Sequence, residues 1–167
     1  MKNYIEKIAH NLFQQLNKDE ELSLNLHSEE SEFVRFNHSK VRQNTHVSQH
    51  EVTLQYQSQH RSYRTIANLT LDFDYDSKNL SSHLFSMREN LKLIDENPKY
   101  FPMENNGTSE VYKKSEYPNS SQLVTEITGV FSDADLAGLL TCGPIRQASL
   151  NSKGQFHYFE NDQFFFD

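Results

Sequence analysis

Residues 47–71 read VSQHEVTLQYQSQHRSYRTIANLTL and contain two runs in which apolar and polar side chains alternate. Apolar residues alternate with Thr and Gln over 52–57, and a second alternation of Tyr, Thr, Ala and Leu covers 63–71. The polar residues 58–61 between them are typical of a tight turn. A period of two predicts strands with one buried face, so the stretch predicts an antiparallel hairpin. Val47 has the opposite parity, which predicts a bulge near Gln49.

The residues before this hairpin extend it into a meander. Alternating leucines over 22–26 predict a strand that ends at the polar cluster 28–31, and residues 32–37 predict the next strand. A turn at Asn37-His38-Ser39 leads to a third strand from Lys40 onward. Apolar residues spaced by three and four predict a helix over 3–17 that covers the sheet.

The second part of the chain begins with the strongest helical pattern. Asp76 or Ser77 can cap a helix whose apolar positions run from Leu80 to Ile94 and which ends before Pro98. Residues 98–118, rich in proline and asparagine, predict a linker or long loop. A short helix is expected over 121–128. Four strands are then expected, separated by turns at 143–144, 152–154 and 161–162: 136–142, 145–150, 155–160 and 163–166.

These patterns predict an α+β fold. An N-terminal helix packs on an antiparallel β-meander, and a long helix and a second antiparallel strand set follow. We therefore expect two parts, a helix and sheet subdomain over 1–75 and a helix, loop and strand set over 76–167.

The charge disfavours nucleic acid as a partner. The chain of 167 residues has a net charge of -7, and such a surface repels a polyanion at long range. One loose basic patch could imitate an RNA-binding sheet, in which aromatic residues stack on bases. Its members are Arg35, Lys40, Arg42, Arg61 and Arg64, with Tyr56 and Tyr63. A small RNA-binding sheet domain is therefore an alternative, ranked below a stand-alone protein-interaction module.

Composition and cysteine content indicate a folded cytoplasmic protein. Although hydrophobic residues make up only 35%, there are 12 Phe and 8 Tyr, which disordered chains rarely carry. No apolar run is long enough for a signal peptide or a membrane span. The single cysteine, Cys142, cannot form an internal disulfide, which suits a reducing compartment. We interpret it as a buried structural thiol.

No catalytic or metal-binding residue is predicted. The nucleophile elbow, the phosphate-binding loop and the dinucleotide turn all need glycine motifs that are absent. His46 and His50 imitate a metal pair, but on a strand they lie roughly 13 Å apart, too far for one ion. The acids Asp133 and Asp135 are typical of helix capping or loop solvation.

The C-terminal residues Phe164-Phe165-Phe166 place three large rings at a chain end, where polar residues are usual. We interpret this as a sign that the natural polypeptide continues, although a terminal strand inside a sheet or a subunit contact would also account for it.

Two stretches resemble the TldD/PmbA family, which is also called the modulator of DNA gyrase or peptidase U62 family. The first is FVRFNHSKVRQ at 33–43, and the second is DLAGLLTCGPIRQASLNSKGQFHYFE at 135–160. They occur in the family's order, and the resemblance spans essentially the whole chain. The signature positions, whose roles the resemblance does not define, are Arg35, Asn37, Arg42, Gln43, Asn151, Ser152 and Gly154.

The resemblance implies the N-terminal domain of a longer two-domain protein. The family's zinc site is a His-Glu-x-x-x-His motif in its C-terminal half, whereas here His50-Glu51 is followed by Gln55. Zinc is therefore expected only in an absent C-terminal half or in a partner subunit. The first stretch is closer to the PmbA (TldE-like) branch, although the sequence leaves open whether the parent protein bears zinc.

The resemblance also implies partners and a role. We expect the rest of the polypeptide, a homodimer or a heterodimer with a TldD-like subunit, and an unfolded peptide substrate, with no membrane. The domain would form part of a metalloprotease substrate chamber without catalytic atoms of its own. A peptide added as a strand beside residues 46–57 and 61–71 would suit their Gln-, Ser- and Thr-rich faces.

Overall fold

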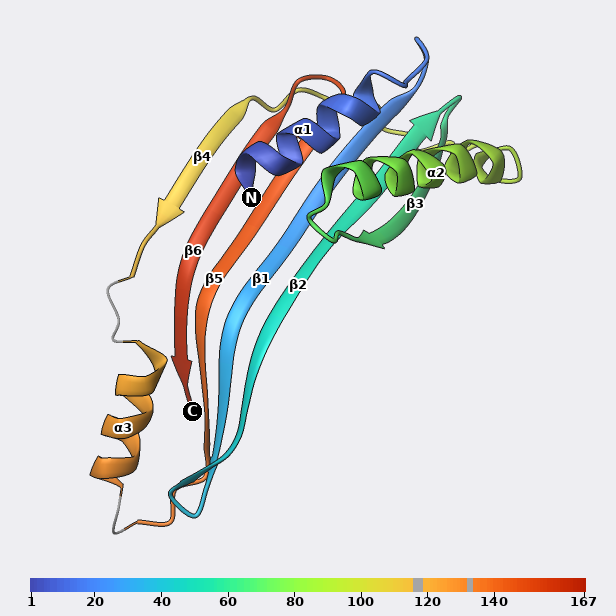
Figure 1. Cartoon of the computed structure of the whole chain (residues 1–167). Helices are drawn as coiled ribbons and strands as arrows, with labels where there is room; N and C mark the ends of the chain where they lie inside the picture. The colour runs from blue at the N-terminus through green and yellow to red at the C-terminus, as the bar shows by residue number, and fades with distance from the viewer. Residues whose placement is uncertain (116–118, 132–133) are drawn as a thin grey trace. The chain divides into compact units, whose positions relative to one another are not determined.

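The computed structural model describes residues 1–115, 119–131 and 134–167, and its sheet has the strand order β3-β2-β1-β5-β6-β4 (Figure 1). The helices are α1 (Lys2–Phe13), α2 (Phe73–Leu91) and α3 (Ser120–Val130). The strands are β1 (Glu21–Asn37), β2 (Lys40–Ser58), β3 (Arg61–Asn68), β4 (Thr108–Lys113), β5 (Gly138–Asn151) and β6 (Phe156–Phe166). The expected α+β fold is confirmed, with an N-terminal helix, a meander β1-β2-β3, a long helix and a second strand set.

The described chain divides into two compact units, each built from three segments. The first unit contains Met1–His27, His50–Val111 and Arg146–Phe159. The second unit contains Ser28–Gln49, Tyr112–Ile145 and Glu160–Asp167. The strands β1, β2, β4, β5 and β6 contribute residues to both units. Each unit therefore contains residues from both sides of residue 75.

The first unit has two helices over one face of its strands (Figure 1). The apolar stripe of α1, including Ile5, Ile8 and Leu12, is fully buried against the leucines of β1 and β2. Leu80 and Leu84 of α2 complete the same core. The three-and-four spacing in the sequence therefore buries one face of each helix.

The second unit has a smaller core beneath α3. Val34 and Phe36 of β1 pack with Leu123 of α3 and Leu140 of β5. The rings of Phe36 and Phe166 meet edge to face, with centroids 6.1 Å apart. The ring of Phe166 thus belongs to this core, whereas Phe164 and Phe165 are 43% and 55% exposed.

β1 is continuous, so the predicted turn at 28–31 is wrong. Ser28 and Ser31 are 0% and 7% exposed within the strand. Strand pairing on both sides of β1 overrides the turn preference of this polar cluster. One strand thus replaces the two that were expected over 22–26 and 32–37.

β5 and β6 are also continuous, and the predicted turns at 143–144 and 161–162 are wrong. Gly143 has φ 151°, and a Cβ there would lie 2.0 Å from the carbonyl oxygen of Glu30. This glycine therefore marks the close approach of β5 to β1 and does not form a turn. The third expected turn, at 152–154, does separate β5 from β6.

Two further boundaries differ from the expectation. The linker expected over 98–118 contains β4, which lies beside β6 in the sheet, while its last residues, 116–118, lie outside the described residues. The N-cap of α2 is Asp72, which accepts hydrogen bonds from the backbone N–H groups of Asp74 and Tyr75. Asp76 and Ser77, the two expected caps, lie inside α2, and Asp76 is completely buried. α1 ends at Phe13, four residues before its expected end.

Candidate functional site

Part of β2 lacks a neighbouring strand on one side. β2 lies between β3 and β1, and β3 pairs antiparallel with only Glu51–Ser58 of it. Within the part of the chain that the structure describes, Lys40–Val47 therefore has no strand on the side where β3 would continue. We call Lys40–Val47 the open edge; it belongs to the second unit. A strand with one free side presents a row of backbone N–H and C=O groups to which an extended chain can bind.

The open edge begins at a tight hairpin turn. His38 and Ser39 connect β1 to β2 with φ values of 50° and 54°, as a type I′ turn requires. The Ser39 hydroxyl donates to the carbonyl oxygen of Ala134 and accepts from the backbone N–H of Leu136 at 3.1 Å. His38 Nδ1 lies 2.9 Å from a carboxylate oxygen of Asp135. These contacts fix the turn against residues 134–136. The other member of the acid pair, Asp133, lies outside the described residues.

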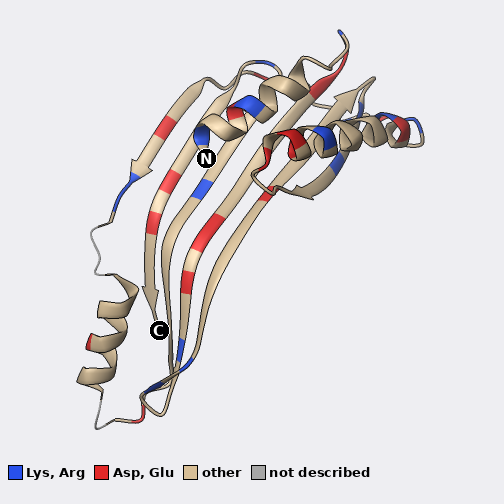
Figure 2. Cartoon of the chain, viewed as in Figure 1, with Lys and Arg blue, Asp and Glu red and all other residues tan. Residues whose placement is uncertain are grey.

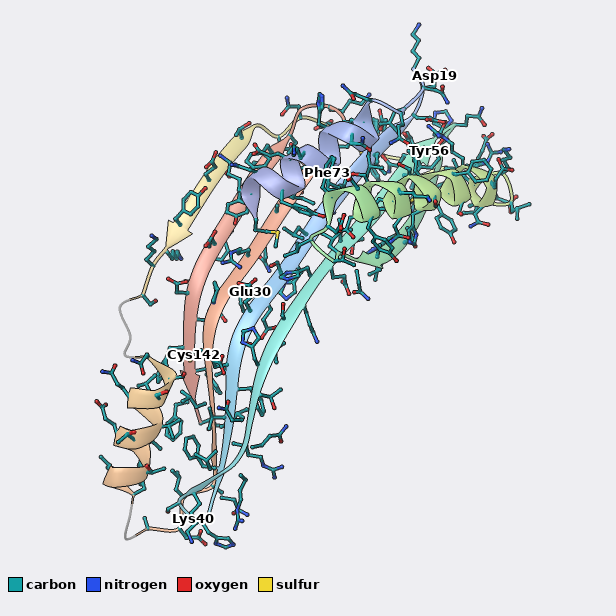
Figure 3. All side chains as sticks on the ribbon, viewed as in Figure 1. Asp19, Glu30, Lys40, Tyr56, Phe73 and Cys142 are labelled. Atoms are coloured by element: carbon teal, nitrogen blue, oxygen red, sulfur yellow. The ribbon has the colours of Figure 1, made fainter. Side chains whose placement is uncertain are left out.

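Positive charge gathers around the open edge, at the end of the β1–β2 hairpin (Figure 2). The sequence has no Asp or Glu from Phe33 to His50, while Arg35, Lys40 and Arg42 lie within that interval. All three side chains are exposed, and none forms an ion pair with a described residue. Figure 3 shows Lys40 at the end of the β1–β2 hairpin.

Several cations of the first unit, unlike those at the open edge, form ion pairs with described residues. Arg88, Arg61 and Lys153 each contact a carboxylate, at 2.6 Å from Glu20, 3.3 Å from Glu96 and 2.8 Å from Glu21 respectively. The three cations beside the open edge, by contrast, are available to an external partner.

A hollow of about 210 Å³ adjoins the open edge. Its lining combines β1, β2 and the first turns of α3, and it consists of Val34, Val41, Asn44, Ser120, Ser121 and Val124. α3 starts here because Asn119 caps it, with its side chain accepting from the backbone N–H of Gln122. No charged side chain lines the hollow, so it suits an apolar or neutral group.

Four of the signature positions lie at this hairpin. Arg35 and Asn37 lie at the end of β1, and Arg42 and Gln43 are the third and fourth residues of β2. The side chain of Gln43 donates to Thr45 Oγ1 at 3.2 Å. The hairpin thus brings together residues that the sequence placed on both sides of a turn.

The other three signature positions form the β5–β6 turn in the first unit. The Asn151 side chain donates to the carbonyl oxygen of Glu104 at 2.8 Å and accepts from the backbone N–H of Lys153 at 2.9 Å. Ser152 exchanges two hydrogen bonds with the backbone of Leu22. Gly154 has φ 96°, a conformation that glycine adopts without strain. These contacts hold the turn against its neighbours.

The basic patch considered for RNA binding is divided between the units. Arg61 donates to the carbonyl oxygen of Ile94 at 2.7 Å, and it lies with Arg64 in the first unit, while the other cations lie in the second. Tyr56 is only 3% exposed, so its ring has no free face for a base. Tyr63, the other aromatic member, is partly buried against the core of the first unit, so neither ring of this patch is fully exposed for stacking.

The surroundings of His46 and Cys142 are those of structural residues: His46 contacts a carboxylate, and Cys142 is buried. His46 Nδ1 lies 3.0 Å from Glu32 Oε1. Among the described residues, no group of three or more His, Cys, Asp or Glu side chains could hold a metal ion. Cys142 is 6% exposed, and burial raises the pKa of its thiol, as does the charge of Glu32.

Two polar networks in the first unit have no counterpart in the sequence patterns. Glu20, Tyr56 and Arg88 form one, and Tyr4, Thr70 and Asp76 form the other. Burial raises the pKa of Tyr56 to about 12, assisted by its hydrogen bond to Glu20. Both networks join residues far apart in the chain, so no local spacing could reveal them.

No family model and no curated protein matches this sequence. Solved structures do match it. The described fold superposes on TldE from Thermococcus kodakarensis with a TM-score of 0.66 and 13% identity, over 98% of this chain and 42% of that chain. The fold resembles that of TldE.

Two proposed modulators of DNA gyrase share this TldE-like fold. One, from Thermotoga maritima, has a TM-score of 0.66 at 12% identity, and one from Bacteroides thetaiotaomicron has 0.59 at 14%. Each match covers 99% of this chain and 38% of that chain. The expected resemblance is thus confirmed at the level of the fold, and the chain spans about two fifths of the TldE-like structures.

Proposed function

We propose that this chain is the N-terminal scaffold and substrate-chamber domain of a TldD/PmbA-type zinc metalloprotease, without catalytic atoms of its own. The observation that carries the proposal is the match of 98% of the chain to 42% of TldE at a TM-score of 0.66. The stretches at 33–43 and 135–160 support it independently, because their resemblance to this family rests on the sequence alone.

The action that we assign to the domain is to hold an unfolded peptide as an added strand. The open edge supports this assignment, since backbone hydrogen bonds provide affinity that does not depend on sequence. The exposed outer side of β3, the last strand of the sheet, is the second edge to which such a peptide could add. Proteolysis itself belongs to other parts of the parent protein.

The described residues do not fit a zinc site, because no suitable group of ligands occurs among them. His50-Glu51 lies on β2, and position 55, where the family motif has histidine, is Gln55. We assign no step of the reaction to this chain. The zinc would be held by a C-terminal half or by a TldD-like partner subunit, in a cytoplasmic homodimer or heterodimer. No helix in the described residues is long and apolar enough to cross a membrane.

A nuclear magnetic resonance titration of the full chain with an unstructured peptide tests strand addition. We expect saturable changes in the backbone amide signals of the open edge, or of 46–71 if the peptide adds beside β3. The control is the same peptide N-methylated at every residue, which removes the N–H groups of both edges and is expected not to bind. Unchanged signals in both regions at millimolar peptide would refute strand addition.

A protease assay tests the absence of catalytic atoms. The chain incubated with casein and zinc is expected to give no cleavage. Proteolysis that a chelator abolishes would contradict the assignment of the zinc site to other residues.

A further inference from the structure

We infer that the open edge selects an extended acidic peptide segment that carries an aliphatic side chain. This inference rests on the proposed function, because it presumes that a peptide adds as a strand beside Lys40–Val47. It goes further by assigning the class of segment that binds.

The positive charge around the open edge favours an acidic segment. The interval 33–50 contains Arg35, Lys40 and Arg42 and no acidic residue, in a chain with a net charge of -7. Several other cations of the described chain lie within hydrogen-bond distance of carboxylates, as Arg88 does with Glu20 at 2.6 Å. The long side chains of lysine and arginine can reach an added strand from either face of the sheet. Carboxylates on that strand would supply the partners that these cations lack among the described residues.

Acidic side chains lie on the elements around the hairpin. His38 and His46 face Asp135 and Glu32, so each of these acids is already engaged by an imidazole. The first turn of α3, which also adjoins the edge, has no acidic residue. Within the second unit, the other acids on these elements are Glu29 and Glu30 of β1 and Glu126 of α3, and all of them lie outside the interval 33–50. The positive surplus is therefore confined to the hairpin residues 35–42.

The hollow beside the open edge favours an aliphatic side chain. Val41 is 41% exposed on the open edge, whereas Val34, also in the lining, is only 2% exposed. With Val124, these residues give the hollow an aliphatic wall. Side chains of a strand alternate between faces, so an added strand directs every second residue toward the face on which α3 packs. A volume of about 210 Å³ suits one valine-sized or leucine-sized side chain.

When a peptide binds at a sheet edge, affinity and specificity commonly come from different groups. The main-chain hydrogen bonds give affinity, and pockets for alternate side chains give specificity. Here the hollow fixes one aliphatic position, and the surrounding cations favour acidic neighbours. Nucleic acid would satisfy the cations, but it has no group suited to the aliphatic hollow and no backbone to pair with β2.

The test uses four capped peptides and the full chain. The reference peptide is Gly-Asp-Ser-Glu-Val-Glu-Ser-Asp-Gly. In the second peptide the acids are replaced by Asn and Gln, in the third by Lys, and in the fourth the central Val is replaced by Gly. At low salt we expect the reference to bind about tenfold more tightly than the amide peptide and more tightly still than the lysine peptide. We expect several-fold weaker binding without the valine.

Salt and a pair of variants separate the charge from the strand. The acidic preference is expected to fall below about threefold at 0.5 M salt, because exposed charges are then screened. The triple variant Arg35→Gln/Lys40→Gln/Arg42→Gln should abolish the preference while still binding the amide peptide. Arg64→Gln, an exposed cation on β3, is the matched control and should retain the preference.

The outcomes distinguish this inference from the proposed function. Equal affinities for all four peptides, with shifts at Lys40–Val47, would refute the selection and leave strand addition intact. Absence of any shift at the sheet edges would refute strand addition itself. A single-stranded oligonucleotide that displaces the acidic peptide at equal concentration would show that the cations serve nucleic acid, and would overturn the inference.

Discussion

Arg88 of α2 binds both carboxylate oxygens of Glu20, with its Nε 3.0 Å from Oε1 and one terminal nitrogen 2.6 Å from Oε2. The same terminal nitrogen donates to the carbonyl oxygen of Gln15 at 2.6 Å. One guanidinium thus joins the chain after α1, the residue that precedes β1 and the last turn of α2. Such two-point pairing is stronger and more directional than a single lysine contact.

Because of this ion pair, the fold should lose stability at acid pH. Burial alone would raise the pKa of Glu20, but hydrogen bonds from Arg88 and Asn17 outweigh burial and lower the pKa from 4.5 to about 2. A carboxyl group whose pKa is lower in the folded state stabilises the fold above its unfolded pKa. That contribution, about 3 kcal/mol, is lost as the pH falls from about 5 toward 2. Urea unfolding of the wild type and of Glu20→Gln should show a gap at pH 7 that narrows across this window.

The matched control is Glu89→Gln, because Glu89 forms an exposed pair with Lys92 at 2.7 Å. Exposed pairs contribute little, so we expect a change below about 0.5 kcal/mol at any pH. The pKa of Glu21 is also lowered, so the free energy of unfolding of Glu20→Gln should still fall somewhat at acid pH. A gap between the wild type and Glu20→Gln that is the same at pH 7 and pH 3 would contradict the role of this ion pair.

Asp76 is the second polar anchor of the first unit. Its completely buried carboxylate accepts from the backbone N–H groups of Thr70 and Leu71, each at 3.0 Å, and from the Tyr4 hydroxyl at 2.5 Å. Burial raises the pKa of Tyr4, as do its hydrogen bond to Asp76 and that residue's charge, so the tyrosine stays a donor. Asp76→Ala leaves buried donors without a partner, and we expect a loss of about 3 kcal/mol in thermal or urea unfolding.

Two further variants test that assignment. Tyr4→Phe removes one donor and should cost about 1 kcal/mol. Asp74→Ala removes an exposed acid from the same turn of α2 and should change stability by less than about 0.5 kcal/mol. Equal effects of Asp74→Ala and Asp76→Ala would mean that helix-terminus charge, and not the buried network, matters.

The sequence was informative where one local period dominates. The leucine spacing of α1 and α2 and the alternation in β2 and β3 predicted these elements because each buries a single face. The turn predicted at residues 28–31 was wrong because Ser28 and Ser31, although common in turns, lie inside a paired strand. Gly143 misled similarly, since its close contact with Glu30 depends on the position of a strand more than 100 residues away. Long-range pairing of this kind has no local signature.

The candidate site was predictable in its charges but not in its geometry. The cations near residues 35–42 and the absence of acids there can be read directly from the sequence. The open edge cannot, because it exists only since β3 pairs with Glu51–Ser58 and ends there. The hollow likewise requires Val124 of α3 to meet Val34 and Val41, which no spacing indicates.

Cys142 gives a chemical test of the second unit. Cys142 lies on β5 (Figure 3). Its side chain is buried, and burial and the Glu32 carboxylate both raise the pKa of the thiol. Only the thiolate is reactive, so labelling by a disulfide reagent at pH 8 should be at least about a hundredfold slower in the native chain than in urea. Comparable rates in the two states would show that this part of β5 opens readily.

The contact between Gly143 and Glu30 predicts opposite effects for two glycine variants. A Cβ at position 143 would lie 2.0 Å from the Glu30 carbonyl oxygen and 2.8 Å from the Ser31 Cα, and backbone cannot yield as a flexible side chain does. Gly143→Ala should therefore cost at least about 2 kcal/mol. Gly129 lies in α3, where an added methyl group would meet no atom within 4 Å, so Gly129→Ala should stabilise the chain by up to about 1 kcal/mol. Urea unfolding of both variants checks the pair, and a neutral Gly143→Ala would mean that β5 does not approach β1 as closely as described.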